Sequence, residues 1–165
     1  MIVQSVFLVA PALLVMLGAA PATAQTSHSP AQAAATAASA TVLPIRVENA
    51  WIPQPPGGAA VAAAYFTLHN VGDKPAVLVD IDCPLAGSAM LHRTTVVAGE
   101  SRMRMVDRLT IPPGQSVTLA PGGLHVMLDQ LTSPLAVGQR VPLTLHFAGG
   151  KDLHVEAKVR PLGSR

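Results

Sequence analysis

Residues 140–159 read RVPLTLHFAGGKDLHVEAKV, and apolar and polar side chains alternate on both sides of a central AGGKD. Such alternation over 140–148 and 152–159 is typical of strands that bury one face. Glycines followed by Lys-Asp favour a tight turn between them. We therefore expect two strands joined by a turn in this part of the chain.

The same pattern continues back to Pro44. Runs that alternate or carry β-branched residues are separated by the turn signals PPGG, NVGDKP, AGE, IPPGQ and APGG. These runs are residues 45–52, 60–70, 76–83, 88–97, 101–106, 115–120 and 124–129. Many short strands at close spacing predict an all-β fold, an antiparallel sandwich or Greek-key β-barrel, with no helix after the leader.

The first part of the chain has a different composition. Of the 165 residues, 11 are Lys or Arg and 9 are Asp or Glu, and all of them lie at Arg46 or later. An apolar run over 5–20 is followed by Ala22-Thr23-Ala24, which fits a secretory cleavage site. We predict a signal peptide over 1–24, a flexible Ala/Ser/Thr-rich spacer over 25–43 and a β-domain over 44–161. The alternative is an uncleaved leader that acts as a membrane anchor.

Several function classes receive no support from the sequence. The net charge is only +2, and no Lys/Arg cluster is interleaved with aromatics, so a nucleic-acid partner is not expected. One cysteine, Cys83, excludes an intramolecular disulfide and any CxxC motif, and we expect it to be buried at a strand end. Neither a G-x-S-x-G elbow nor a Ser/His/Asp spacing indicates a hydrolase. We expect a protein that is not an enzyme.

Methionine and histidine gather in one window. After the leader, every methionine lies between residues 90 and 127, and two histidines share that window: Met90, His92, Met103, Met105, His125 and Met127. Thioether sulfur is soft and favours Cu(I), and imidazole accepts copper in either oxidation state. Residues two apart on a strand point to the same face, so His125 and Met127 would form one pair. Met-rich strand faces are also used to fill cores, and we expect Met90 to do so; the alternative is that it is a spare sulfur near the site.

A hairpin would bring more of these side chains together. Residues 88–97 and 101–106 flank Ala98-Gly99, so they are expected to pair as antiparallel strands. His92 would then lie roughly opposite the region of Met103 and Met105. Periodicity does not choose between these two methionines, because both face the same way.

The spacing in this window resembles a known family. His92, ten residues, Met103, twenty-one residues, His125, one residue and Met127 is similar to the pattern of the periplasmic copper chaperones called PCu(A)C. The surrounding blocks NAWIPQPPGG, AAYFTLHNVGDKP, IPPGQSVTLAPGGLHVML and GQRVPLTLHF resemble that family too, over residues 45–160. The resemblance implies a cupredoxin-like β-barrel with an exposed Cu(I) site. Its ligands would be His92, Met103, His125 and Met127, with Met105 as a neighbour only.

The resemblance also implies a role. Family members are thought to supply copper in the periplasm to the CuA centre of cytochrome c oxidase, on subunit II, alongside Sco-type proteins. The membrane would enter only as the location of the recipient. Two alternatives come from other classes. A blue-copper electron-transfer protein would need a His₂Cys core that includes Cys83, with a weak axial Met. A metal-free exported β-domain that binds a protein partner would take up no copper.

Overall fold

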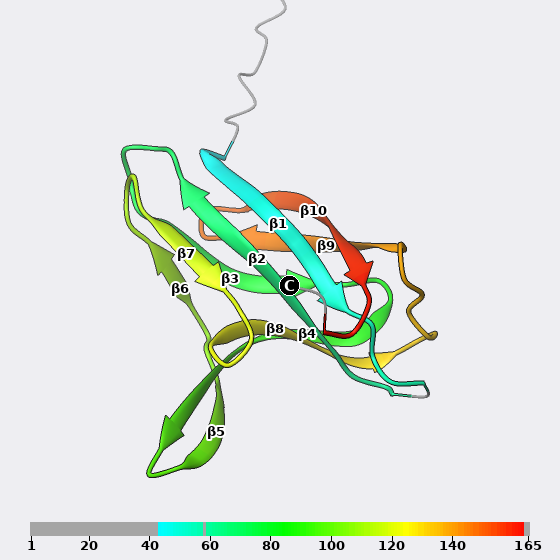
Figure 1. Cartoon of the computed structure of the whole chain (residues 1–165). Coiled ribbons are helices and arrows are strands. Elements are labelled where there is room, and N and C mark those ends of the chain that lie inside the picture. The colour runs from blue at the N-terminus through cyan, green and yellow to red at the C-terminus, as the bar shows by residue number, and fades with distance from the viewer. Residues whose placement is uncertain (1–42, 58, 164–165) are drawn as a thin grey trace, which may run out of the picture. The chain divides into compact units, whose positions relative to one another are not determined.

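The computed structural model describes residues 43–57 and 59–163, and these residues form ten β-strands and no helix (Figure 1). The strands are β1 Ile45–Pro53, β2 Ala62–Asn70, β3 Ala76–Asp82, β4 Ala86–Val97, β5 Glu100–Met105, β6 Leu109–Ile111, β7 Ser116–Leu119, β8 Leu124–Leu131, β9 Arg140–Phe147 and β10 Lys151–Arg160. The predicted signal peptide and all but the last residue of the predicted spacer lie outside the described residues. Within the described residues, no helix suited to crossing a membrane is found.

Seven of the strands close into a barrel. Their order is β4-β8-β2-β1-β10-β9-β3, and β3 returns to β4 through the pair Ile81 and Ala89. The remaining strands extend it: β5 pairs with β4, β6 with β3 and β7 with β2. The predicted all-β fold is confirmed. One detail differs, because β1 and β10 pair in parallel while the other pairs are antiparallel.

The barrel is filled by alternate side chains of its strands. On β2 the buried positions include Phe66 and Leu68, and on β9 they include Leu143 and Leu145, each no more than 1% exposed. Period-two burial of this kind is why the sequence alternates. Cys83 follows β3 directly and is buried among these residues, as predicted.

The sequence analysis missed β6. Leu109–Ile111 pairs with Ala76–Leu78 at the start of β3, although residues 111–115 read as a turn signal. The buried Asn70 fixes this corner, because its side-chain amide donates to the carbonyls of Lys74 (2.8 Å) and Ile111 (2.9 Å). A strand of three residues is too short to show a period.

Strands β4 and β5 form an arm that projects from the barrel (Figure 1). β4 is 12 residues long; it pairs with β8 as far as Arg93 and with β5 from His92 to Val97. Ala98 and Gly99 join the two strands with φ of 53° and 81°, as in a type I′ turn. The predicted hairpin over 88–106 is confirmed, and its base carries the candidate site.

Candidate metal centre

The candidate site lies on the outer face of β4 and β8. Leu91 of β4 and Val126 of β8 point into the core, so their neighbours along each strand point outward. The register places His92 directly opposite His125. It also places Met90 directly opposite Met127. Two adjacent cross-strand pairs therefore gather imidazole and thioether groups on one face.

The two histidine rings approach each other edge to face. Their centroids are 5.9 Å apart and their planes are inclined by 78°. His125 is buried, and its Nδ1 lies 3.1 Å from the carbonyl oxygen of Gly123. Since a carbonyl only accepts, Nδ1 carries the proton and donates it, which leaves the lone pair on Nε2. A backbone partner that fixes the tautomer in this way is typical of histidines that bind metals.

The arm adds a thioether from β5. Met103 Sδ lies 3.1 Å from His92 Nδ1, although the residue directly opposite His92 in the register is Met105. The two methionines share a face of β5, and both are more than half exposed. The sequence could not choose between them, whereas the contact in the structure is made by Met103.

A shallow cavity adjoins these residues. It has a volume of about 290 Å³, and Met103, His125 and Met127 form part of its wall. Ala63 lies directly opposite Met127 on β2, and its small side chain also lines the cavity. The opposite wall includes Pro55 and Pro56, which the sequence analysis treated only as a turn signal. Three of the four predicted ligands thus line one mostly apolar hollow, and the fourth, His92, contacts Met103.

The electrostatics of the site favour neutral histidine. Burial lowers the pKa of His92 below its ordinary value, and the nearby His125 lowers this pKa further. Both effects act against the charged imidazolium. A neutral imidazole keeps the lone pair that a metal ion needs.

Two aromatic residues extend the site beyond what sequence reasoning found. The Tyr65 ring of β2 is 6.5 Å from the His125 ring, and Trp51 of β1 lies 4.9 Å from Tyr65 between ring centroids. The Arg160 guanidinium stands over Trp51 at 5.3 Å. Both aromatic residues lie within the sequence blocks NAWIPQPPGG and AAYFTLHNVGDKP, but sequence reasoning assigned no role to either of them. Their rarity, at 3% aromatic residues, was the available signal.

Other residues considered from the sequence lie elsewhere or act differently. Met90 is half-buried beside the cluster and is not part of the buried core, which corrects the prediction that it fills the core. Burial raises the pKa of the Cys83 thiol above its ordinary value. In the described part of the chain, no three His, Cys, Asp or Glu side chains are grouped to hold a metal. A His₂Cys core, as in blue-copper proteins, is therefore not formed by these residues.

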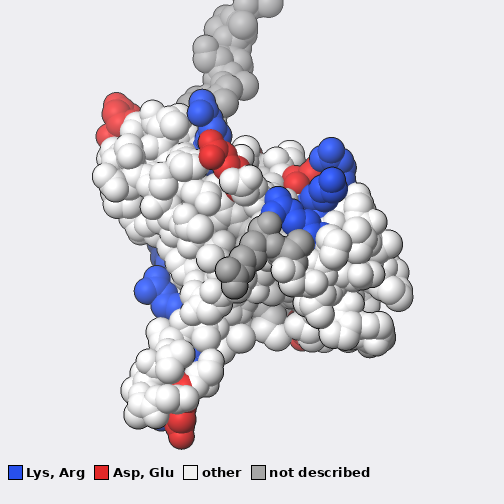
Figure 2. Space-filling view, in the orientation of Figure 1, with Lys and Arg blue, Asp and Glu red and all other residues white. Residues whose placement is uncertain are grey.

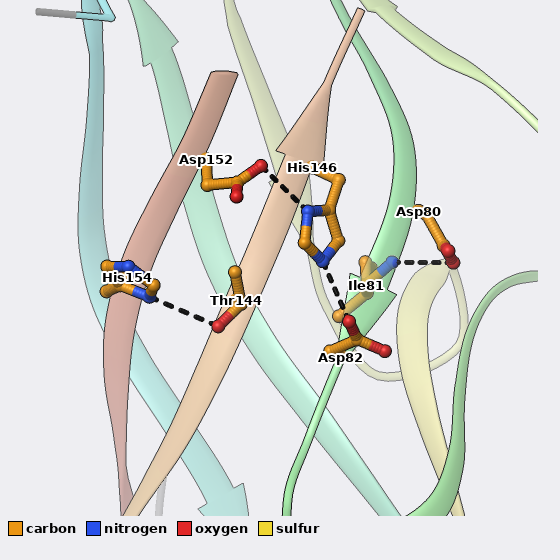
Figure 3. Close-up of polar contacts among 7 residues, drawn as sticks. All are labelled: Asp80, Ile81, Asp82, Thr144, His146, Asp152 and His154. Atoms are coloured by element: carbon orange, nitrogen blue, oxygen red, sulfur yellow. Dashed lines mark hydrogen bonds and ion pairs between the residues drawn. The ribbon is translucent and has the colours of Figure 1, made fainter. Parts of the chain in front are cut away.

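The late histidines have polar partners of their own. Figure 3 shows His146 between two carboxylates, with Nδ1 2.8 Å from Asp152 and Nε2 2.9 Å from Asp82. His154 lies 3.1 Å from the hydroxyl of Thr144. These contacts tie β3, β9 and β10 together on the outside of the barrel.

The protein is thus a closed β-barrel that carries a cluster of two histidines and two methionines on its outer face, and known proteins share its family and fold. The family model described as "Putative lipoprotein LpqE-like" matches residues 45–159. The chain belongs to this family, which is the PCuAC family. A relative, "Putative lipoprotein Lxx21020" of Leifsonia xyli subsp. xyli, is 33% identical over 117 residues, which are 70% of this chain and 69% of that protein.

Solved structures give the same result. The solution structure of CuI-DR1885 from Deinococcus radiodurans is 43% identical with a TM-score of 0.59, over 77% of this chain and 85% of that one. The copper-bound PCuAC domain from PmoF2 is 28% identical with a TM-score of 0.60, over 72% of this chain and 93% of that one. The fold is cupredoxin-like, as predicted.

Proposed function

We propose that the protein binds Cu(I) through His92, Met103, His125 and Met127. The observation that carries this proposal is the meeting of two imidazoles and two thioethers from three strands, with Met103 Sδ 3.1 Å from His92 Nδ1. Neutral, soft sulfur donors combined with imidazole suit Cu(I) better than hard cations. Two similar solved structures, CuI-DR1885 and the copper-bound PCuAC domain from PmoF2, contain copper, which supports the same choice of metal.

We further propose that the copper is cargo and that the protein is a chaperone without catalytic turnover. Met103 is 53% exposed on a projecting arm, so an incoming ligand can replace it while the other three still hold the ion. The proposed recipient is the CuA centre on subunit II of cytochrome c oxidase, directly or through Sco-type proteins. Neither recipient is needed for the binding itself, so binding and delivery are tested separately.

Delivery in this form requires export. We propose a periplasmic protein whose leader is cleaved after Ala24, followed by the spacer over 25–43 and the β-domain over 44–161. The word lipoprotein in the name of the Leifsonia relative supports an exported protein. Mass spectrometry of the cell-derived protein is expected to give a chain that starts at Gln25. A mass that retains the leader would instead favour the membrane-anchored form.

An anaerobic Cu(I) titration against a coloured competing chelator tests the site. The parent is expected to bind one equivalent. Met103→Leu is expected to weaken binding by about tenfold or more, which is about 1.4 kcal/mol. Met105→Leu is the matched control, because it removes a thioether from the same face of the same strand and has no ligand role here. Equal losses in the two variants would contradict the assignment of Met103.

A transfer assay tests the recipient. Two equivalents of the Cu(I)-loaded protein would be mixed without oxygen with one equivalent of a copper-free soluble CuA domain of subunit II. One electron would then be removed from the filled centre with ferricyanide, because two Cu(I) ions are colourless and only the mixed-valence pair is purple. Appearance of the CuA spectrum with the parent is the expected result. Copper retention by the parent in the presence of the empty domain would contradict direct delivery to CuA.

A further inference from the structure

The arm formed by β4 and β5 has two chemically different faces. Residues directly opposite in an antiparallel pair share a face. His92 opposite Met105 and Thr94 opposite Met103 therefore form the copper-binding face. On the other face Arg93 lies directly opposite Arg104, and Thr95 lies opposite Arg102. We call this second face, with Arg93, Arg102 and Arg104, the arginine face.

The arginine face carries positive charge that the described part of the chain does not neutralise. Arg102 reaches Glu100 at 3.1 Å, whereas Arg93 and Arg104 form no ion pair with any described residue. All three arginines are exposed. Like charges directly opposite each other destabilise a strand pair. Folding alone therefore gives no reason for Arg93 and Arg104 to be opposite each other.

The arginines are also not spread evenly over the exposed arm, because all three lie on one of its two faces. Arg93 lies on the same side of β4 as the buried Leu91, which points into the barrel. Where the arm leaves the barrel, this side becomes cationic. The copper-binding face exposes Val96 (71%), Met103 (53%) and Met105 (61%), whereas the arginine face exposes one large apolar side chain, Val97 (52%), opposite Glu100. On the side seen in Figure 2, the arm is mostly free of blue atoms, with acidic atoms near its end.

The outer edge of β5 brings the two faces together. Among the described strands, β5 pairs with β4 alone, so its other edge is open. Arg102, Met103, Arg104 and Met105 alternate along it, which places guanidinium and thioether groups on opposite sides about 3.4 Å apart along the strand. A segment lying against this edge would reach the arginines on one side and the copper ligand on the other.

We propose that the arginine face docks an acidic segment of the protein that receives the copper. This inference rests on the proposed chaperone function and names the chemistry of its partner. Guanidinium groups bind carboxylates through two parallel hydrogen bonds. Complementary charge speeds encounter and fixes orientation. Open backbone groups on β5 can pair with an extended peptide. A lipid surface offers no backbone groups to pair with the open edge of β5, so a peptide is the favoured partner.

The test measures docking on the copper-free protein, so that its outcome does not depend on the metal site. The probe is a fluorescent synthetic peptide of alternating Glu and Thr, and its comparison is the same peptide with Gln in place of Glu. The variant is Arg93→Glu with Arg104→Glu. The matched control is Arg46→Glu with Arg140→Glu, two exposed arginines on β1 and β9 with the same total change in charge. Arg93→Gln with Arg104→Gln is a milder second variant, and circular dichroism checks that each protein folds.

At low ionic strength the parent is expected to bind the Glu peptide about tenfold more tightly than the Gln peptide, and salt is expected to reduce this preference. The arginine-face variants are expected to lose the preference, and the control pair is expected to keep most of it. A Lys/Thr peptide is expected to bind the Arg93→Glu, Arg104→Glu protein. The Cu(I) affinity, titrated in parallel, is expected to be unchanged in all variants.

Two results would overturn the proposal. Equal loss of peptide binding in the control pair would mean that only net charge matters. Binding of the parent to vesicles that contain phosphatidylglycerol, without binding of the Glu peptide, would assign the arginine face to a lipid surface. A failed Cu(I) titration alongside preserved peptide binding would instead reject the proposed function and leave the arginine face as a docking surface for an acidic chain.

Discussion

At the scale of single residues, the two histidines of the site have different surroundings. His125 is buried and its ring is fixed by the Gly123 carbonyl, 3.1 Å from Nδ1. His92 is half-buried, contacts Met103, and stands at the base of the arm. One histidine of the candidate site is therefore buried and held by the backbone, whereas the other is more accessible and contacts the exposed Met103.

The pH dependence of copper binding follows from His92. Its pKa is lowered, first by burial and then by His125, so protons compete with copper for the His92 ring only below the ordinary histidine pKa of about 6.5. Cu(I) affinity is expected to stay level as the pH falls to this value and to decline only at lower pH. Affinity measured across the acidic range, together with the NMR titration of the ring protons, checks this.

His146 is the internal control for that titration. Its pKa is raised, first by the hydrogen bond with Asp152 and then by the one with Asp82. The two rings should therefore titrate on opposite sides of the ordinary value in one NMR experiment. A His92 ring that titrates at or above the His146 ring would contradict the lowered pKa of His92.

Asn70 is a buried polar residue on which the corner between β2 and β6 depends. Its side chain donates to Lys74 and Ile111 and accepts from the backbone N–H of Gly72 at 3.0 Å. Asn70→Ala leaves these backbone groups without their partners and is expected to lower the free energy of unfolding by about 2–3 kcal/mol. Urea unfolding checks this value. A loss below about 0.5 kcal/mol would mean that water replaces the amide without cost.

At the scale of strands, the sequence predicted most of what the structure contains. The alternation that defines β9 and β10 depends only on which side chains face the core, so a period of two reveals it directly. The sequence did not predict β6, because three residues cannot establish a period. The sequence did not predict the parallel pairing of β1 and β10, because the pattern of apolar and polar residues in a strand does not depend on the direction of its partner.

The turn of the arm was located correctly from its glycine, but its strain was not visible in the sequence. Ala98 has φ of 53°, a left-handed conformation that costs a non-glycine residue about 1–2 kcal/mol. Asn tolerates this conformation better, and Asn-Gly is the favoured pair in type I′ turns. Ala98→Asn is expected to stabilise the arm by about 0.5–1 kcal/mol.

Hydrogen exchange of the β5 amides measures this effect on the arm, because local opening is detected there before global unfolding. Slower exchange in Glu100–Met105, with little change in β9, is the expected result. Gly99→Ala, at φ of 81°, is the opposite control and should speed exchange in the same strand. Faster exchange in Ala98→Asn would show that the turn is not type I′ in solution.

At the scale of the whole molecule, the site exists because the barrel closes. Residues 92 and 125 are far apart in sequence and meet only because β4 pairs with β8. Met103 joins them because the arm folds back beside β4. The single-sequence pattern could place each pair of neighbours on one face, but it could not bring β4 to β8. The grouping of the four proposed ligands came from the resemblance of the spacing to a family, and the pairing of β4 with β8 and β5 brings these four residues close to one another.

Copper should therefore act as a link between the arm and the barrel. A ligand that binds only the folded state raises the free energy of unfolding by about 4 kcal/mol when its free concentration is a thousand times the dissociation constant. Cu(I) bound by β4, β5 and β8 together is expected to raise the melting temperature and to slow exchange of the β5 amides in particular. Met103→Leu removes the contribution of β5, so the copper-loaded variant should keep part of the thermal gain and lose the protection of the arm. Equal protection of β5 in parent and variant would place the metal on β4 and β8 alone, outside the reach of the arm.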